Sequence, residues 1–217
     1  MRPEEYTVID IETYPNLEMI DRLPEPDVKY GNTKDEDKRQ VKYEEAVVKQ
    51  IDDMALSPLY GKIACVGYGK GVDNVDCAIY ENEEDVVKFI FETLLKFGQT
   101  GSPKIVTWNG MGFDVPFIYK RALILGVKPT VSMGYFMKRY QTETHCDLMQ
   151  IWMNWYGYEK LDNVARALLN EGKQDFDVKT IKDLMKTETG RDNISTYCKQ
   201  DVEITSKLFY KMANVLF

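Results

Sequence analysis

The stretch YTVIDIETYP, residues 6–15, places two carboxylates in a segment that otherwise has the composition of a buried strand. Alternate side chains of a strand share a face, so Asp10 and Glu12 point the same way. Ile9 and Ile11 then point to the opposite face. The two acids are aimed at one place, where they can act together. The alternative at this point is a strand end that runs into solvent, where acids cost little.

A third acid, Asp114, follows a glycine-containing loop in IVTWNGMGFDVPFI, residues 105–118. This stretch predicts a buried strand, a loop and then the start of a helix that carries Asp114. An aspartate at a helix start is often a simple N-cap. Here Trp108, Phe113 and Phe117 are its sequence neighbours, so Asp114 also suits the wall of a pocket with apolar sides.

The last chemical pair is Tyr197 and Asp201, in the stretch YCKQD of the final predicted helix. A spacing of four residues puts the phenol and the carboxylate on one helical face, within reach of a shared ligand. Chance pairs of this kind are common in a chain of this composition. The pair therefore gains meaning only from the order of the other motifs.

The elements that must position these side chains follow from hydrophobic periodicity and from turn and cap residues. Strands early in the chain, one helix between them and helices late in the chain predict an α/β domain with a mixed sheet. The predicted strands are 61–69 and 74–80, joined as a hairpin, and 104–108. A short strand or helix start is predicted at 144–152. Two helices are predicted to begin after Asn82 and at Asp114. Three more are predicted at 161–170, 180–187 and 194–217.

Residues 24–58 are polar and interrupt the pattern directly after the first strand. Their first half contains Pro, Gly and Asn and predicts a loop. Residues 35–56 have mixed charge and apolar side chains at Val41, Val47 and Ile51, which suits a surface helix. We interpret 24–58 as an insertion within a single domain that covers residues 1–217.

Composition limits the class of protein. With 217 residues, of which 44% are hydrophobic, the chain can bury one good core. It begins without the apolar run of a signal peptide and has no stretch of about 18 apolar residues, so a cytoplasmic protein with no membrane partner is expected. The net charge of −7 argues against a protein that coats long nucleic acid, although a compact site for one chain end remains compatible.

The four cysteines, Cys65, Cys77, Cys146 and Cys198, are far apart in sequence and form no Cys-x-x-Cys pair. The only histidine is His145, so the sequence offers too few ligands at suitable spacing for a zinc site. We expect reduced, half-buried thiols.

The chain resembles the DEDD, or DnaQ-like, 3′-5′ exonuclease superfamily in the order of its motif residues, Asp10, Glu12, Asp114, Tyr197 and Asp201. More narrowly, DIET, WNGMGFDVPFI and YCKQD are similar to the three exonuclease motifs of the proofreading domain of family B DNA polymerases, and residues 160–173 resemble the segment before the third motif. Thr196 stands where the sister subtype has histidine, so the tyrosine subtype, DEDDy, is indicated. The likeness excludes about residues 24–58 and leaves no length for a polymerase domain, so we expect a stand-alone exonuclease with a ribonuclease H-like fold.

The resemblance implies two divalent ions, Mg²⁺ or Mn²⁺, which prefer oxygen ligands. Asp10, Glu12 and Asp201 would hold the inner ion. Asp10 would bridge to the second ion, and Asp114 would act through water or the outer ion. Tyr197 would orient the attacking water, because its ordinary pKa of about 10 makes it a poor general base.

Further contacts are implied by position in the motifs. Thr13, Asn109 and Phe113 match positions that hold the 3′-terminal nucleotide, where an aromatic ring can stack on any base. Lys173 matches a lysine near the scissile phosphate. Its alternative role is a solvated charge directly after Gly172, which would end the preceding helix.

The expected activity is the 3′-5′ hydrolysis of single-stranded DNA with release of nucleoside 5′-monophosphates. The expected partner is a nucleic-acid 3′ end, with DNA favoured over RNA, and a replication or repair partner is not identified. An exonuclease for RNA or oligonucleotides and a non-catalytic nucleic-acid-binding module are the alternatives. His145 and Asp147 are expected to be structural or rim residues, and Asp147 could also support the site from behind.

Overall fold

A mixed five-stranded sheet is the centre of the protein. A computed structural model describes residues 2–96 and 101–216. The strand order is β3-β2-β1-β4-β5, in which β1 to β3 pair antiparallel and β1, β4 and β5 pair parallel. The predicted mixed sheet is confirmed. The strands are β1 (Thr7–Pro15), β2 (Gly61–Gly69), β3 (Val75–Ile79), β4 (Ile105–Thr107) and β5 (His145–Asp147).

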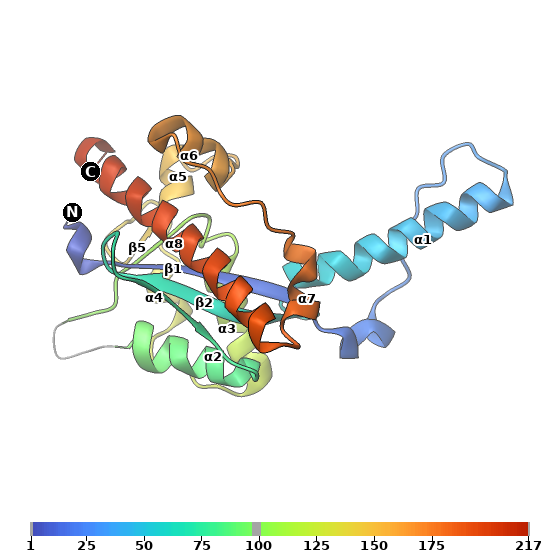
Figure 1. Cartoon of the computed structure of the whole chain (residues 1–217), viewed down its shortest axis with the longest axis horizontal. Helices are drawn as coiled ribbons and strands as arrows, with labels where there is room; N and C mark the ends of the chain where they lie inside the picture. The colour runs from blue at the N-terminus through green and yellow to red at the C-terminus, as the bar shows by residue number, and fades with distance from the viewer. Residues whose placement is uncertain (1, 97–100, 217) are drawn as a thin grey trace.

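Helices cover both faces of this sheet (Figure 1). The long α8 (Glu188–Leu216) and α6 (Leu161–Leu169) pack on one face, and α2 (Glu83–Phe89) and α3 (Asp114–Leu125) pack on the other. The shorter α-helices are α4 (Met133–Phe136), α5 (Leu148–Trp152) and α7 (Ile181–Leu184). Short 3₁₀-helices occur at Pro3–Glu5, Leu17–Arg22, Met54–Leu56 and Val178–Thr180, and a π-helical turn at Ile90–Leu94 follows α2.

Strand β1 divides the core as its alternation predicts. Val8 packs in the cluster under α6 and α8, whereas Ile9 and Ile11 pack in the cluster with α2 and α3. A β-bulge shifts the register of the β1–β2 pairing between Glu12 and Thr13. Up to that bulge, Asp10 and Glu12 lie on the α8 side of the sheet.

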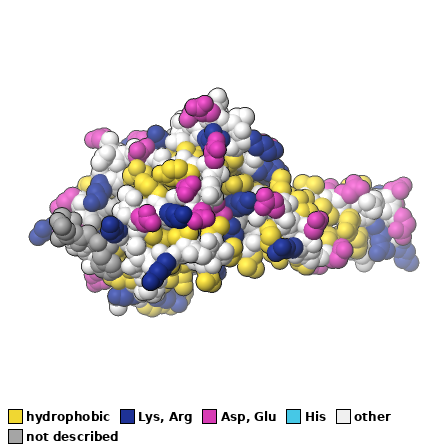
Figure 2. Space-filling view, turned by 90° about the horizontal axis from the view of Figure 1, so that it is seen from below, with side chains coloured by type: hydrophobic (Ala, Val, Ile, Leu, Met, Phe, Trp, Pro, Cys, Tyr) yellow, Lys and Arg dark blue, Asp and Glu magenta, His cyan; other side chains and the backbone are white. Residues whose placement is uncertain are grey.

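The insertion contains helix α1 (Glu36–Asp53), which projects from the body as an arm with no buried residue (Figure 1). Asp35 caps the helix by accepting hydrogen bonds from the backbone of its first turn. The preceding loop folds back along the helix, since Gln50 donates to the Pro24 carbonyl at 2.9 Å. Apolar side chains gather at the root of the arm, and charged side chains dominate its tip (Figure 2). The predicted loop and surface helix are confirmed.

A buried ion pair joins β2, α2 and α3. Arg121 Nε and Nη2 donate to the two oxygens of Glu83 at 2.7 and 2.6 Å. The Ile63 backbone N–H donates to the same carboxylate at 2.9 Å, and Arg121 Nη1 donates to the Pro58 carbonyl at 2.9 Å. Every polar atom of the pair that lies in the core therefore has a partner.

Within the described ranges, no helix combines the length and apolar character that a membrane crossing requires.

Candidate active site

Asp10 and Glu12 form the first half of the site, on β1. One carboxylate oxygen of each residue and the Sγ of Cys198 all lie within 4.8 Å of one another. Glu12 is buried and Asp10 is half-buried. Burial raises the pKa of Asp10, and the charges of Asp114, Asp201 and Glu12 raise it further. Burial and then the charge of Asp201 likewise raise the pKa of Glu12.

Asp114 reaches across to β1 from the first turn of α3. Its Oδ1 accepts a hydrogen bond from the Ile11 backbone N–H at 3.1 Å. Asp114 is the first residue of the helix rather than its N-cap, which is Phe113, and no side-chain bond caps this end. Burial raises the pKa of Asp114 to about 7, although the bond from Ile11 opposes the rise. The hydrogen bond from Ile11 therefore holds the Asp114 carboxylate beside β1.

Asp201 enters the site from α8 and pairs with Lys173 through Oδ2. Its other oxygen, Oδ1, is buried without a hydrogen-bond partner among the described residues. Burial raises the pKa of Asp201, although Lys173 acts in the opposite direction. Burial lowers the pKa of Lys173, but the charges of Asp201 and Tyr197 and the hydrogen bonds to both residues together outweigh it, so the pKa rises.

Tyr197 lies one helical turn before Asp201 and is 7% exposed. Its ring is stacked on Phe176 at a centroid distance of 4.3 Å and an angle of 14°. Lys173 Nζ lies 4.9 Å from the centre of the same ring. Burial, followed by the charges of Asp201 and Glu12, raises the pKa of Tyr197. The phenol is therefore held in place and protonated at neutral pH.

These groups meet at a cleft with a volume of about 420 Å³. Among the residues that the sequence singled out, its walls contain Asp10, Asn109, Phe113, Asp114, Lys173 and Asp201. Glu12 and Tyr197 do not line this cleft, although both interact electrostatically with Asp201. The Thr13 hydroxyl donates to the Ala55 carbonyl at 2.7 Å, so it ties the strand to the end of the insertion.

Asp147 organises the loop that carries Asn109. Its two oxygens accept from the backbone N–H groups of Asn109 and Met111 at 3.0 and 2.8 Å. Asn109 has a positive φ of 65°, a conformation that asparagine tolerates better than most residues. His145 is buried between Thr107, at 2.8 Å, and the Phe136 carbonyl, at 3.1 Å. Asp147 therefore has a structural role at the carboxyl end of β5, and His145 has one at the start of the same strand.

Five further residues of the cleft wall lie outside the three exonuclease motifs. Asp162 accepts a hydrogen bond from the Lys173 backbone N–H at 2.8 Å and so positions the loop that carries this lysine. The others are Leu56, at the end of the insertion, Tyr158, Lys160 and Leu161. Residues 160–162 belong to the segment that resembles the one before the third motif, whereas Leu56 and Tyr158, which are 65% and 64% exposed, have no signal in the sequence.

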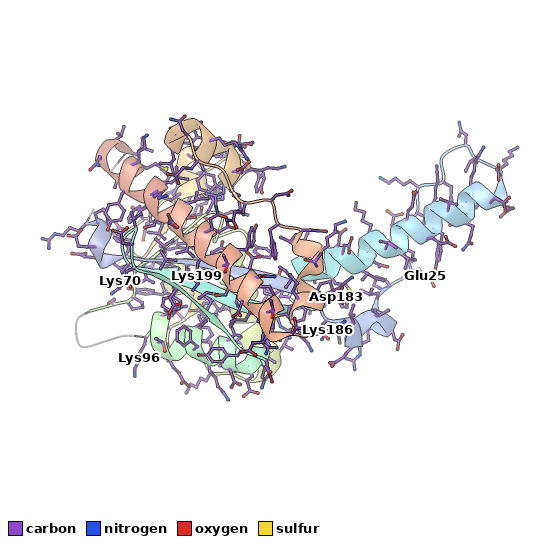
Figure 3. The ribbon with its side chains drawn as sticks, in the orientation of Figure 1. Glu25, Lys70, Lys96, Asp183, Lys186 and Lys199 are labelled. Carbon is purple, nitrogen blue, oxygen red and sulfur yellow. The ribbon has the colours of Figure 1, made fainter. Side chains whose placement is uncertain are left out.

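A larger hollow of about 870 Å³ occupies a different part of the molecule. Its lining includes Lys70 and Lys96, which are labelled in Figure 3, and none of the motif acids. The two acids of its lining, Glu5 and Asp76, each pair with a lysine instead of converging on one point. We therefore place the candidate chemistry in the smaller cleft.

The acids fit hard divalent cations. All four offer oxygen, the ligand that Mg²⁺ and Mn²⁺ prefer. Asp201 Oδ1 is a buried acceptor that lacks a donor, and a cation would satisfy it. Burial, followed by the charges of Asp114, Asp201 and Glu12, raises the pKa of Asp10, which means that positive charge is deficient there. Asp10, Glu12, Asp114 and Asp201 are the residues that could hold such ions.

The chain is similar to known proteins in its sequence and in its fold. It is 31% identical to DNA polymerase 1 of Sulfurisphaera ohwakuensis over 142 residues, which are 59% of this chain and 15% of that protein. It is 30% identical to DNA polymerase 1 of Sulfolobus acidocaldarius over 149 residues, or 63% of this chain and 16% of that protein. The chain therefore covers about a sixth of the length of these curated relatives.

The structure of the family B DNA polymerase from Pyrobaculum calidifontis has the same fold. The TM-score is 0.62 at 16% identity, over 96% of this chain and 24% of that one. The ribonuclease H-like α/β fold, a mixed sheet flanked by helices, is thereby confirmed.

A family model described as a predicted 3′-5′ exonuclease related to the exonuclease domain of PolB matches residues 62–216. The match contains Asp114, Lys173, Tyr197 and Asp201, and β1 lies before it. Since the match covers well over half of the sequence, the chain belongs to this family of predicted exonucleases related to the exonuclease domain of PolB.

Proposed function

We propose that this protein is a metal-dependent 3′-5′ exonuclease of the tyrosine subtype, which removes nucleoside 5′-monophosphates from the 3′ end of single-stranded DNA. The observation that supports it most is the convergence of acids from β1, α3 and α8 on one cleft, with a buried Asp201 oxygen left without a partner. We further propose that residues 1–217 form one exonuclease domain, with 24–58 as an insertion within it.

In this proposal Asp10, Glu12 and Asp201 would hold one divalent ion, and Asp10 and Asp114 would help to hold a second. When bound, a pair of such ions lowers the pKa of a water molecule and offsets the charge that develops on the leaving oxygen. The protein contributes the arrangement of the acids. The Ile11 backbone N–H holds Asp114, and α8 presents Asp201 to β1.

Tyr197 orients the attacking water by a hydrogen bond. Its raised pKa makes it a donor at neutral pH and unsuitable as a general base. Phe176 fixes the ring by stacking, so the hydroxyl has a defined direction. Lys173, which lies on the cleft wall and pairs with Asp201, supplies positive charge where a phosphate would approach.

The 3′-terminal nucleotide would bind along the wall that contains Asn109 and Phe113. Phe113 is partly buried and packs against Phe117 at a centroid distance of 5.3 Å, so its ring has a stable orientation for stacking on a base. Thr13 would act through its backbone, because its hydroxyl is bound to Ala55. The curated relatives are DNA polymerases, which favours DNA over RNA as the substrate.

The test uses single-stranded DNA and RNA oligonucleotides, each labelled at the 5′ end or at the 3′ end, with Mg²⁺, Mn²⁺ or EDTA. We expect the 3′ label to appear at once as a mononucleotide and the 5′-labelled strand to shorten stepwise, on DNA faster than on RNA. Asp10→Ala should abolish both products, and Asp73→Ala, a change at an exposed acid in the β2–β3 turn, should not. Absence of metal-dependent shortening on every substrate would contradict the proposal, and faster shortening of RNA would reassign the substrate.

A further inference from the structure

Three of the four cysteines meet behind the acids. The Sγ atoms of Cys65 on β2, Cys77 on β3 and Cys198 on α8 all lie within 4.8 Å of one another. All three are free thiols. The fourth, Cys146, packs in a different core cluster with β4 and α6. Sequence spacing gave no sign of this cluster, because the fold unites residues that are far apart in the chain. The expectation of half-buried thiols holds for Cys77 and is wrong for the other three cysteines, which are buried.

The strand register and one glycine explain the cluster. Cys65 pairs with Ile79 and Gly67 pairs with Cys77, so Cys65 and Cys77 are diagonal neighbours on one face of the hairpin. A Cβ on Gly67 would lie 2.7 Å from Cys198 Sγ. The missing side chain therefore leaves the space that Cys198 fills from α8.

The geometry is close to that of a three-sulfur metal site. A zinc–sulfur bond is about 2.3 Å long, so three sulfurs around one zinc ion stand about 4 Å apart. The three Sγ atoms need only small side-chain rotations to reach that spacing from the observed limit of 4.8 Å. Cys65 and Cys198 are fully buried, whereas Cys77 is half-buried and gives an ion access from the surface.

We propose that Cys65, Cys77 and Cys198 form a binding site for a thiophilic d¹⁰ cation of the zinc class, separate from the oxygen site of the acids. Thiolates select soft or borderline ions, whereas carboxylates select Mg²⁺ and Mn²⁺, so the two sites take different metals. Water entering beside Cys77 completes a fourth position, next to the Ser195 hydroxyl that already contacts this thiol. Each thiol releases its proton to solvent when the cation binds.

The thiols and the acids are neighbours in space, and Cys198 lies beside both groups. Cys198 Sγ lies within 4.8 Å of carboxylate oxygens of both Asp10 and Glu12. Its S–H also donates to the Asp10 backbone carbonyl at 3.8 Å. A cation on Cys198 displaces that proton, so occupation of the thiol site removes a contact between α8 and β1. Lys199, the next residue on α8, pairs with Asp76 of β3 at 3.6 Å and lies over the same hairpin (Figure 3).

The test titrates the full chain with Cd²⁺, a spectroscopic probe for thiolate ligation, in excess Mg²⁺ and a phosphine reductant. We expect a sulfur-to-cadmium charge-transfer band in the ultraviolet that saturates at one equivalent and is displaced by Zn²⁺. The half-buried Cys77→Ala variant should lose the band. The matched Cys146→Ala variant, which removes the thiol outside the cluster, and Asp10→Asn should keep it.

A band that is absent from the wild type, or that is unchanged in a folded Cys77→Ala variant, would overturn the proposal. A second measurement needs no variant: one equivalent of Zn²⁺ should slow alkylation of Cys77 by about tenfold or more, because a metal-bound thiolate is a poor nucleophile. Alkylation at the same rate with and without Zn²⁺ would also overturn it. Neither readout depends on nuclease activity, so failure here and failure of the proposed function are distinguishable.

Discussion

Two of the sites where the protein buries carboxylates differ in how the charge is satisfied. Glu83 and Arg121, both with side chains that are 4% exposed, form a two-pronged ion pair in which every oxygen of the carboxylate has a donor. At the candidate active site, Asp10, Glu12 and Asp114 have no cation of their own among the described residues, and Asp201 pairs with Lys173 through one oxygen while the other lacks a donor.

The difference separates a charge that the fold itself satisfies from the acids that we propose to be functional. Burying an ion is costly unless it is paired and hydrogen-bonded, and the Glu83 site meets that condition with the chain's own atoms. The cleft does not, so its stability depends on protons or on cations from solution. Substitutions at the two sites should therefore have opposite signatures, with large losses of stability at one and large losses of activity at the other.

The largest effect is expected for Asp10→Asn, which keeps the shape of the side chain and removes its charge. We expect nuclease activity to fall by about ten-thousandfold, since a metal-bound catalytic centre is worth several kcal/mol. The melting temperature in EDTA should be unchanged or higher, because one repulsive charge is gone. Single-turnover cleavage and thermal melting measure the two quantities. A variant that keeps activity within tenfold would contradict the role of Asp10.

Arg121→Met should show the reverse pattern. It leaves Glu83 buried without its partner, which typically costs about 3–5 kcal/mol of the free energy of unfolding. Urea denaturation would measure this loss, with activity per folded molecule unchanged. Lys88→Met, which breaks an exposed pair with Glu84 on the same helix, is the matched control and should have a far smaller effect. Equal losses in the two variants would contradict the assignment of Glu83 as a buried structural charge.

The free energy of unfolding of the metal-free protein should depend on pH, because Asp114 is buried in the native state and its pKa is raised there. With a pKa of about 7 for Asp114, against an ordinary value of 3.8, the native state binds more protons than the unfolded state between those pH values. Stability therefore falls as pH rises through this window, by up to about 4 kcal/mol from this group.

His145 acts oppositely, because burial lowers its pKa to about 4 and its charging destabilises the native state as pH falls from 6.5. The informative quantity is therefore the difference in free energy of unfolding between the wild type and Asp114→Asn in EDTA. A difference that stays constant from pH 4 to pH 7 would contradict the raised pKa.

Added Mg²⁺ or Mn²⁺ should stabilise the native state, because either cation offsets the repulsion between the acids. At about 100 times the dissociation constant, a ligand that binds only the native state contributes about 2.7 kcal/mol, which corresponds to about 5–10 °C in melting temperature at this chain length. Asp10→Asn should reduce the shift and Arg121→Met should keep it. A melting curve that does not respond to either metal would count against an intact site.

The smallest effect is expected for Tyr197→Phe. It removes one hydrogen bond to the attacking water, worth about 1–1.5 kcal/mol, so activity should fall by about tenfold. The ring still stacks on Phe176, so the melting temperature should not change. Tyr80→Phe, at a tyrosine that is 39% exposed, serves as the control for both assays. A loss as large as that of Asp10→Asn would indicate a direct chemical role for the phenol.

Much of the fold could be predicted from local sequence. The alternation of YTVIDIETYP predicts a strand that separates two core clusters, with Ile11 on one side and the acids on the other, and the structure has that arrangement. Gly126, with a φ of 74°, ends α3, because glycine tolerates the left-handed conformation of a helix end. Such features depend on neighbouring residues and on the conformations that each residue tolerates, and both can be derived from a single sequence.

The motif order also identified three acids that line the cleft, Asp10, Asp114 and Asp201, and the family to which the chain belongs. Which residues do the chemistry nevertheless stays a proposal. The sequence alone left open whether Asp114 is an N-cap or a pocket residue. Only the tertiary structure brought its Oδ1 to the Ile11 backbone, more than 100 positions away in the chain.

Other features depend entirely on tertiary packing. The pairing of Lys173 with Asp201, the stacking of Phe176 on Tyr197 and the meeting of three cysteines join segments that have no local signal for one another. Such contacts follow from strand register and from how closely α8 approaches the sheet, which Gly67 permits. The sequence by itself determined the elements and the candidate acids. The packing of α8 on β1 and β2 decided which of their side chains meet, because distance in space is set by the whole fold.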